Sequence, residues 1–200
     1  VVRDIEGTGG TALAIRADAA DEAATRAAVA QAVATFGRLD ILVNNAGLLL
    51  FGATDTLGAA EFDRIVAVNV RGLYLATQEA LRHLGAGGRI VNIGSINSER
   101  APFAGGALYV MSKAAVAGLT RGLARELGAR GITINNVMPG PTDTDMNPAQ
   151  GEFAAQTVQH VALQRYARPE EIAASVAWLA SPEASYVTGA SIAVDGGYAA

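Results

Sequence analysis

The sequence has no cysteine among its 200 residues, and it has only two histidines. The absence of cysteine excludes disulfides, thiol catalysis and zinc–thiolate sites, and two histidines are too few for a histidine-rich metal site. The net charge is −4 and basic tracts are absent, which argues against a nucleic-acid-binding surface. No apolar run reaches the ~18 residues of a membrane span and no signal peptide is visible, so we expect a cytoplasmic protein without a metal centre.

Lysine is also scarce, because Lys113 is the only lysine among the fifteen basic residues. Lys113 stands four residues after Tyr109, and residues four apart on a helix share one face. A tyrosine hydroxyl has a pKa near ~10, and a nearby cation lowers that pKa by favouring the phenolate. The pair is either a tuned proton donor or a contact on a helix surface. The retention of a single lysine in an arginine-rich chain favours the proton donor.

Short apolar segments alternate with helical ones along the chain, which predicts one α/β domain over residues 1–200 with a parallel sheet. The expected strands are Thr11–Arg16, Leu39–Val43, Arg89–Ile93, Ile132–Val137 and Ser191–Val194. Val1–Glu6 is expected to be the last turns of a helix. The further expected helices are Asp21–Phe36, Ala59–Leu84, Tyr109–Leu127, Glu152–Val161 and Pro169–Ala180.

Polar and small residues follow the ends of the expected strands, where ligands of parallel sheets bind. They are Asp18, the turn Asn44–Gly47, Ser95 and the loop Pro139–Thr144. The asparagine turn either admits a flat nucleoside against the backbone or is an ordinary turn.

The hydroxyl and amide side chains at these positions also leave alternatives open. Ser95 either binds a substrate carbonyl or caps a turn, and Ser98 is a rival for the first role. Asn69 lies on the apolar stripe of its expected helix, where a buried amide needs partners. It is either a structural amide or part of a water-anchored proton relay toward Lys113.

Taken together, the motifs resemble those of the short-chain dehydrogenase/reductase family, over the chain from Thr11 to Ala200. The resemblance implies a Rossmann-type doubly wound parallel sheet with helices on both faces. It also implies an NAD(P)-dependent oxidoreductase that converts a ketone or 3-oxoacyl group to a secondary alcohol, or the reverse. The motifs are Asp18, Asn44-Asn45-Ala46-Gly47, Asn69, Ser95, Tyr109-x-x-x-Lys113, Pro139-Gly140 and Asp195-Gly196-Gly197.

The resemblance implies a role for each motif residue. Tyr109 is the general acid/base, Lys113 lowers its pKa and holds the nicotinamide ribose, and Ser95 steadies the carbonyl. Asn69 completes a water-mediated relay, and Asp18 meets the adenine. The bound cofactor, NADP ahead of NAD, supplies the hydride. The remaining cofactor contacts are Asn44, Ala46 and Gly47 on the adenosine-ribose side, and Pro139, Gly140, Thr142 and Thr144 at the nicotinamide end.

Two features depart from the family pattern. Ser95 stands fourteen residues before Tyr109, where the family more often has thirteen, so Ser98 remains a rival. The glycine-rich Thr-Gly-x-x-x-Gly-x-Gly turn, which brings a pyrophosphate to a helix N-terminus, is absent.

In the family's strand order, 3-2-1-4-5-6-7, strands one and two lie between Thr11–Arg16 and Leu39–Val43, and residues 1–200 contain neither strand. By family analogy we therefore expect roughly fifty residues before Val1 in the natural chain. The alternative is a genuine truncation with poor cofactor binding and little activity, or only a scaffold role.

Within the family, two stretches of the chain are each similar to the same two groups of proteins. The runs Gly94–Arg100 and Pro139–Pro148 are similar to 3-oxoacyl-acyl-carrier-protein reductases and to a cyclic-di-GMP-binding relative that acts in biofilm dispersal. The complete set of proposed catalytic residues favours the enzyme, and cyclic-di-GMP binding with little turnover is the alternative. Family members pair their two long central helices between subunits, so we expect a homotetramer or homodimer.

Overall fold

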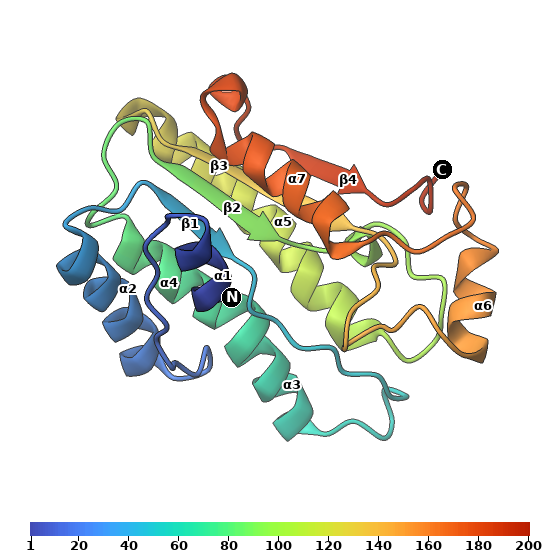
Figure 1. Cartoon of the computed structure of the whole chain (residues 1–200). Helices are drawn as coiled ribbons and strands as arrows, with labels where there is room; N and C mark the ends of the chain where they lie inside the picture. Colours follow the sequence, from blue (N-terminus) through green and yellow to red (C-terminus); the bar gives the residue numbers. More distant parts are fainter.

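The computed structural model describes all residues, 1–200, and is built on a four-stranded parallel sheet. Neighbouring strands follow one another in chain order, and Asn44, Asn92, Asn136 and Ser191 lie in one row across them. Figure 1 shows the four strands side by side in the middle of the molecule. The strands are β1 (Ile41–Asn44), β2 (Arg89–Ile93), β3 (Thr133–Pro139) and β4 (Ser191–Val194).

Most of the expected helices are confirmed within one or two residues. Helix α2 begins after Asp21, whose carboxylate accepts a hydrogen bond from the backbone of Ala24, and it ends at the left-handed Gly37. Helix α7 has the expected bounds, with Pro169 in its first turn. The helices are α1 (Val2–Gly7), α2 (Glu22–Phe36), α3 (Ala59–Val66), α4 (Leu73–Ala80), α5 (Ala107–Leu127), α6 (Glu152–Val158) and α7 (Pro169–Ala180).

Helices cover both faces of the sheet, because successive strand residues point to opposite sides. Ile90 and Ile134 pack against Leu123 and Leu127 of α5 on one face, together with residues of α4. On the other face, Val91, Val137 and Ile192 pack against Ile172 and Leu179 of α7. The sheet is therefore doubly wound, as the sequence predicts.

One expected strand, Thr11–Arg16, is wrong. The segment makes no backbone hydrogen bonds and has no strand beside it, and a strand exists only where its amides and carbonyls pair with a neighbour. Strand β1 is consequently the edge of the sheet, with Ile41 44% and Val43 42% exposed.

The expected helix Ala59–Leu84 is also corrected. A π-helical turn at Ala67–Gly72 interrupts it, and its last regular turn ends at Ala80. Such turns are frequent at functional sites, and this one carries Asn69.

Candidate active site

A cleft of about 860 Å³ opens where the carboxyl ends of β1, β2 and β3 meet. Each strand continues into a segment that lines it: Asn45–Leu49 after β1, Ile93–Asn97 after β2 and Pro139–Thr142 after β3. Helix α5 adds Tyr109 and Lys113 from below. The topology thus brings together residues that lie far apart in the sequence.

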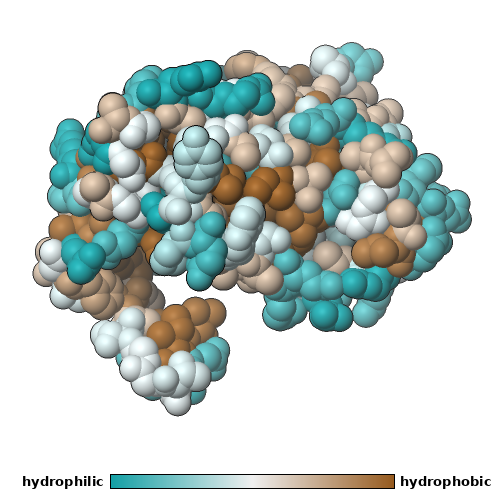
Figure 2. Space-filling view, turned by 90° about the horizontal axis from the view of Figure 1, so that it is seen from above, coloured by the Kyte–Doolittle hydropathy of each residue, from teal (hydrophilic) through white to brown (hydrophobic).

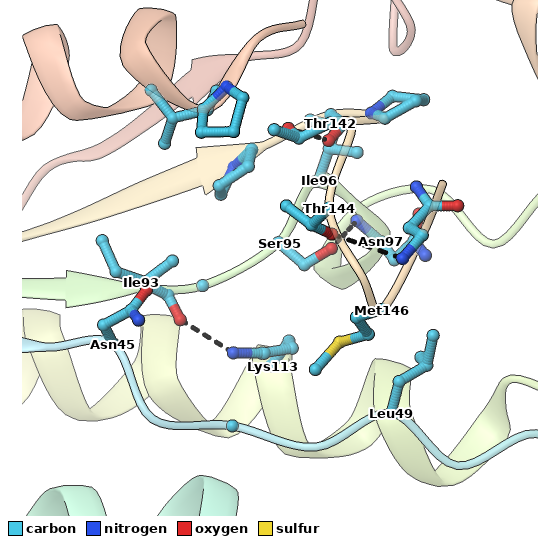
Figure 3. Close-up of a pocket in the computed structure, with 18 of the residues that line it drawn as sticks. Asn45, Leu49, Ile93, Ser95, Ile96, Asn97, Lys113, Thr142, Thr144 and Met146 are labelled. Carbon is cyan, nitrogen blue, oxygen red and sulfur yellow. Dashed lines mark hydrogen bonds between the residues drawn. The ribbon is translucent and has the colours of Figure 1, made fainter. Parts of the chain in front are cut away.

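Tyr109 and Lys113 lie beside each other and both line the cleft, as their spacing on one helix face predicts. The Lys113 Nζ atom lies 5.8 Å from the centre of the Tyr109 ring. It donates a 2.8 Å hydrogen bond to the carbonyl of Ile93 at the end of β2 (Figure 3). Lys113 is only 5% exposed, so burial lowers its pKa to about 8.

The pKa of Tyr109 is raised, not lowered as expected from the nearby lysine. Burial of the phenol is the larger influence, and the Ser95 hydroxyl opposes it by favouring the phenolate. A phenol with a raised pKa keeps its proton at neutral pH. A protonated phenol is the form of a tyrosine that can donate a proton.

Ser95 lines the cleft and Ser98 does not. The Ser95 Oγ accepts a 3.1 Å hydrogen bond from the backbone of Asn97, at the start of a short 3-10 helix, Ile96–Ser98. Its own proton can be donated to the Tyr109 oxygen or to a substrate oxygen beside it. The Ser98 hydroxyl instead donates to the Ser95 carbonyl and contacts Met138. The geometry therefore favours Ser95 over Ser98. Ser95 caps the 3-10 helix and also lines the cleft, so both of its expected roles are compatible.

Asn69 clamps the loop that follows β1. Its Oδ1 accepts a 2.8 Å hydrogen bond from the Leu48 amide, and its Nδ2 donates to the Leu48 carbonyl at 2.9 Å and to the Ser112 hydroxyl at 3.0 Å. Both amide protons are used, so this side chain positions the loop. Gly47 passes so close that a Cβ would stand 3.4 Å from the Lys113 Nζ.

Asn44 does not line the cleft, although it was expected to. Its Nδ2 donates hydrogen bonds to Thr77 and Asn92, and Asn92 in turn donates to Thr120, all buried between the sheet and helices α4 and α5. Asn45 lines the cleft in its place. The sequence contains a signal for this difference, because successive side chains of a strand point to opposite faces of the sheet.

The segment after β3 forms another wall of the cleft. Pro139, Gly140, Thr142 and Thr144 all line the cleft, as the resemblance implies. Gly140 packs tightly against the carboxyl end of β4, where an added Cβ would lie 2.6 Å from the Cα of Asp195.

Asp18 lies outside the main cleft, in a neighbouring hollow. It is exposed, and its Oδ1 accepts a 2.9 Å hydrogen bond from the backbone of Ala20. The hollow and the cleft share Ala46 and Gly47, so one extended ligand can reach both. No three histidine or acidic side chains gather where a metal could be held, and no helix is long and apolar enough to cross a membrane.

Comparisons with known proteins agree with this architecture. A family model described as Enoyl-(Acyl carrier protein) reductase matches residues 1–199. A short-chain dehydrogenase/reductase structure from Serratia marcescens BCRC 10948 is 58% identical, with a TM-score of 0.95 over 97% of this chain and 79% of its own. A short chain dehydrogenase from Burkholderia cenocepacia J2315, in complex with NADP, is 49% identical, with a TM-score of 0.98 over 100% and 81%.

A curated relative bears on function in another way. The cyclic-di-GMP-binding biofilm dispersal mediator protein of Escherichia coli K12 is 49% identical over 189 residues, or 94% of this chain and 78% of the relative.

The doubly wound sheet and the cleft at its carboxyl edge define a Rossmann-type α/β protein. The chain belongs to the short-chain dehydrogenase/reductase family of oxidoreductases, as its motifs predict.

Proposed function

We propose that the protein is an NADP-dependent oxidoreductase that reduces a ketone or 3-oxoacyl group to a secondary alcohol, or runs the reverse reaction. The observation that carries the proposal is the convergence of Ser95, Tyr109 and Lys113 in one cleft. A hydroxyl donor, a protonated phenol and a buried cation are the groups that a carbonyl oxygen needs when it gains a proton. Residues 1–200 act in this proposal as one Rossmann-type domain.

The residues present fit the two ends of a nicotinamide dinucleotide. Thr142 and Thr144 would hold the nicotinamide end, with Pro139 and Gly140 behind them, and Asp18 would meet the adenosine end. Lys113 and the loop at Gly47 lie between these ends. A glycine-rich pyrophosphate turn is not among residues 1–200. When bound, NADPH supplies a hydride to the substrate carbon.

The side chains of this chain move and hold the proton. The Ser95 hydroxyl donates a hydrogen bond to the substrate oxygen, and the Tyr109 hydroxyl transfers its proton to that oxygen as negative charge develops there. The Lys113 ammonium then stabilises the phenolate that Tyr109 becomes. Asn69 keeps the loop beside Lys113 in place through Leu48.

The second candidate function is binding of cyclic-di-GMP without turnover. It rests on the 49% identity to the Escherichia coli relative. The two candidates share a fold and differ in what enters the cleft, so they make opposite predictions for catalysis and for affinity.

Two assays separate the candidates. The first follows ketone-dependent NADPH oxidation with a panel of ketones at millimolar NADPH, and the second measures cyclic-di-GMP binding by calorimetry. We expect turnover with at least one ketone and no tight binding of the dinucleotide. Tight cyclic-di-GMP binding together with no ketone turnover would overturn the proposal in favour of the second candidate.

We further propose that the protein is cytoplasmic and forms a homotetramer or homodimer through α3, α4 and α5. Large apolar side chains stand exposed on these helices: Phe62 at 43%, Tyr74 at 43% and Met111 at 37%. Exposed apolar groups on adjacent helices favour association. Light scattering coupled to size-exclusion chromatography tests the assembly, and a monomer at micromolar concentration would contradict it.

A further inference from the structure

We propose that the substrate end of the cleft selects an uncharged carbonyl compound with an aromatic or similarly bulky apolar group, and rejects ketones that carry an anion. The inference rests on the proposed function and names its substrate class. It is carried by the side chains at the end of the cleft away from Asp18, and by the distribution of charge around the whole cleft.

The two ends of the cleft differ in chemistry. Figure 3 draws Asn45 and Ile93 at one end and Leu49 and Met146 at the other, with Lys113 between them. The second end is continued by aromatic rings. The Phe51 ring lies against Gly106, where an added Cβ would be 3.4 Å from it, and Gly106 caps the helix that carries Tyr109.

A connected aromatic group forms the far wall of this end. The rings of Phe103 and Phe153 are 5.0 Å apart and tilted, and His160 packs edge-on against Phe103 and Tyr198 from behind. Three of the apolar side chains are substantially exposed, Phe51 at 46%, Phe153 at 49% and Met146 at 52%, and each lines the cleft. Apolar groups exposed together toward a cleft mark a binding surface for an apolar ligand.

Figure 2 views the molecule from above, and hydrophobic residues are exposed across the middle of this face between hydrophilic rims. The side chains that form the proposed apolar end are Leu49, Phe51, Phe103, Met146, Phe153 and Tyr198.

Charge is almost excluded from the cleft. Of the 31 residues that line it, Lys113 alone is charged, and its ammonium is held by the Ile93 carbonyl beside Tyr109. Asp143 and Asp145 alternate with Thr142, Thr144 and Met146 along the loop, and the two acids do not line the cleft.

One further cation stands near the apolar end. Arg100 lies 5.0 Å from the centre of the Tyr198 ring and outside the lining. A carboxylate or phosphate at the apolar end would lose part of its hydration and would find no cation among the residues that line that end. A neutral ring would lose only ordered water and would gain edge and face contacts with the phenylalanines.

A matched pair of ketones tests the inference. We would measure NADPH-dependent reduction of 4-acetylbenzamide, which is neutral, and 4-acetylbenzoate, which has the same shape and a negative charge. The expected kcat/KM is ~100-fold higher for the neutral ketone. Equal values within a few-fold would overturn the inference while leaving the proposed function standing.

Calorimetry with the same two ketones gives a readout that does not depend on turnover. If neither ketone is reduced, the proposed function fails, and the binding constants still decide the substrate class. Preferential binding of the benzamide supports the inference, and equal or preferential binding of the benzoate contradicts it.

A charge placed on the aromatic wall gives the converse test. Phe153 stands at the rim on α6 and is half-exposed, so Phe153→Arg keeps its cation near solvent and should fold. We expect this variant to raise kcat/KM for 4-acetylbenzoate ~10-fold or more relative to the benzamide. Phe36→Arg is the control, since Phe36 is 44% exposed at the end of α2 and outside the cleft. An unchanged ratio in Phe153→Arg, or the same change in both variants, would contradict the inference.

Discussion

The two ends of the site are built in different ways. At the reacting end, Lys113 is 5% and Ser95 7% exposed, and both are fixed by hydrogen bonds to the segment that leaves β2. At the other end, Asp18 is exposed and follows a segment that has no strand partner. The parallel strands and the row of buried asparagines across them hold the first end in place, whereas only a local turn shapes the second. Substitutions at the reacting end should therefore lower activity far more than a substitution of Asp18.

Apart from loss of the Tyr109 hydroxyl itself, the largest effect is expected from Lys113→Met. The variant removes the only charge in the cleft and leaves a phenolate at Tyr109 without a cation, so kcat/KM should fall ~10³-fold. The measurement is ketone-dependent NADPH oxidation. Arg121→Met is the matched control, because Arg121 is an exposed cation on the same helix and should leave the rate little changed. Similar losses in both variants would show that Lys113 has no special role.

The next effect concerns stability and pH. The pKa of Lys113 is about 8 in the folded protein, against 10.5 for an ordinary lysine. Below pH 8 the ammonium is charged in the folded and unfolded states alike. Between these two values only the unfolded chain keeps the proton, so the free energy of unfolding rises with pH, by ~3 kcal/mol in total.

Urea unfolding of the wild type and Lys113→Met at about pH 7 and about pH 10 measures this effect. The gain should appear in the wild type and be missing from the variant. Parallel pH dependences would mean that Lys113 is not held in a desolvated site.

A smaller effect is expected from Gly140→Ala. The added methyl group would meet the backbone of Asp195 at 2.6 Å, so the end of β3 must shift away from β4. We expect a loss of ~1–3 kcal/mol in the free energy of unfolding, with a fall in activity as Thr142 moves. Gly122→Ala is the control, since Gly122 lies within α5 with open space around it, and it should stabilise by ~1 kcal/mol. Chemical denaturation of both variants measures the difference.

The smallest effect is expected from Asp18→Ala. The carboxylate is exposed and its one hydrogen bond is to the nearby Ala20 amide, so the fold should be unaffected. We expect the KM for NADPH to rise roughly two- to tenfold, the equivalent of one hydrogen bond, with kcat unchanged. Asp55→Ala, in an exposed loop, serves as the control. A loss of kcat in Asp18→Ala would place Asp18 closer to the reaction than the structure does.

The sequence was sufficient for the reacting end because its signals are local. The spacing of Tyr109 and Lys113 and the position of Ser95 after a strand predict their meeting, and the structure brings them together. The expected strand Thr11–Arg16 was wrong because a strand forms only beside a neighbour, and the strands expected between it and β1 are not among residues 1–200. The π-helical turn at Asn69 also left no recognisable signal.

The apolar end was not predicted. Phe51, Phe103 and Phe153 come from three separate segments, and no spacing along the chain relates them. Only the folded sheet edge and α6 place their rings around one cleft. The strand end shows a related limit, since the side chain of Asn44 is bonded to Thr77 and Asn92 and that of Asn45 lines the cleft.

In the proposed reaction, Tyr109 donates the proton that completes carbonyl reduction. Tyr109→Phe removes one hydroxyl and keeps the ring that packs near Lys113, so the fold and NADPH binding should be retained. The most direct measurement is ketone-dependent NADPH oxidation by the wild type and this variant, side by side, at NADPH concentrations that saturate both. The expected result is a loss of ~10²–10⁴-fold in kcat with NADPH affinity unchanged. Equal kcat values in the two proteins would contradict the account.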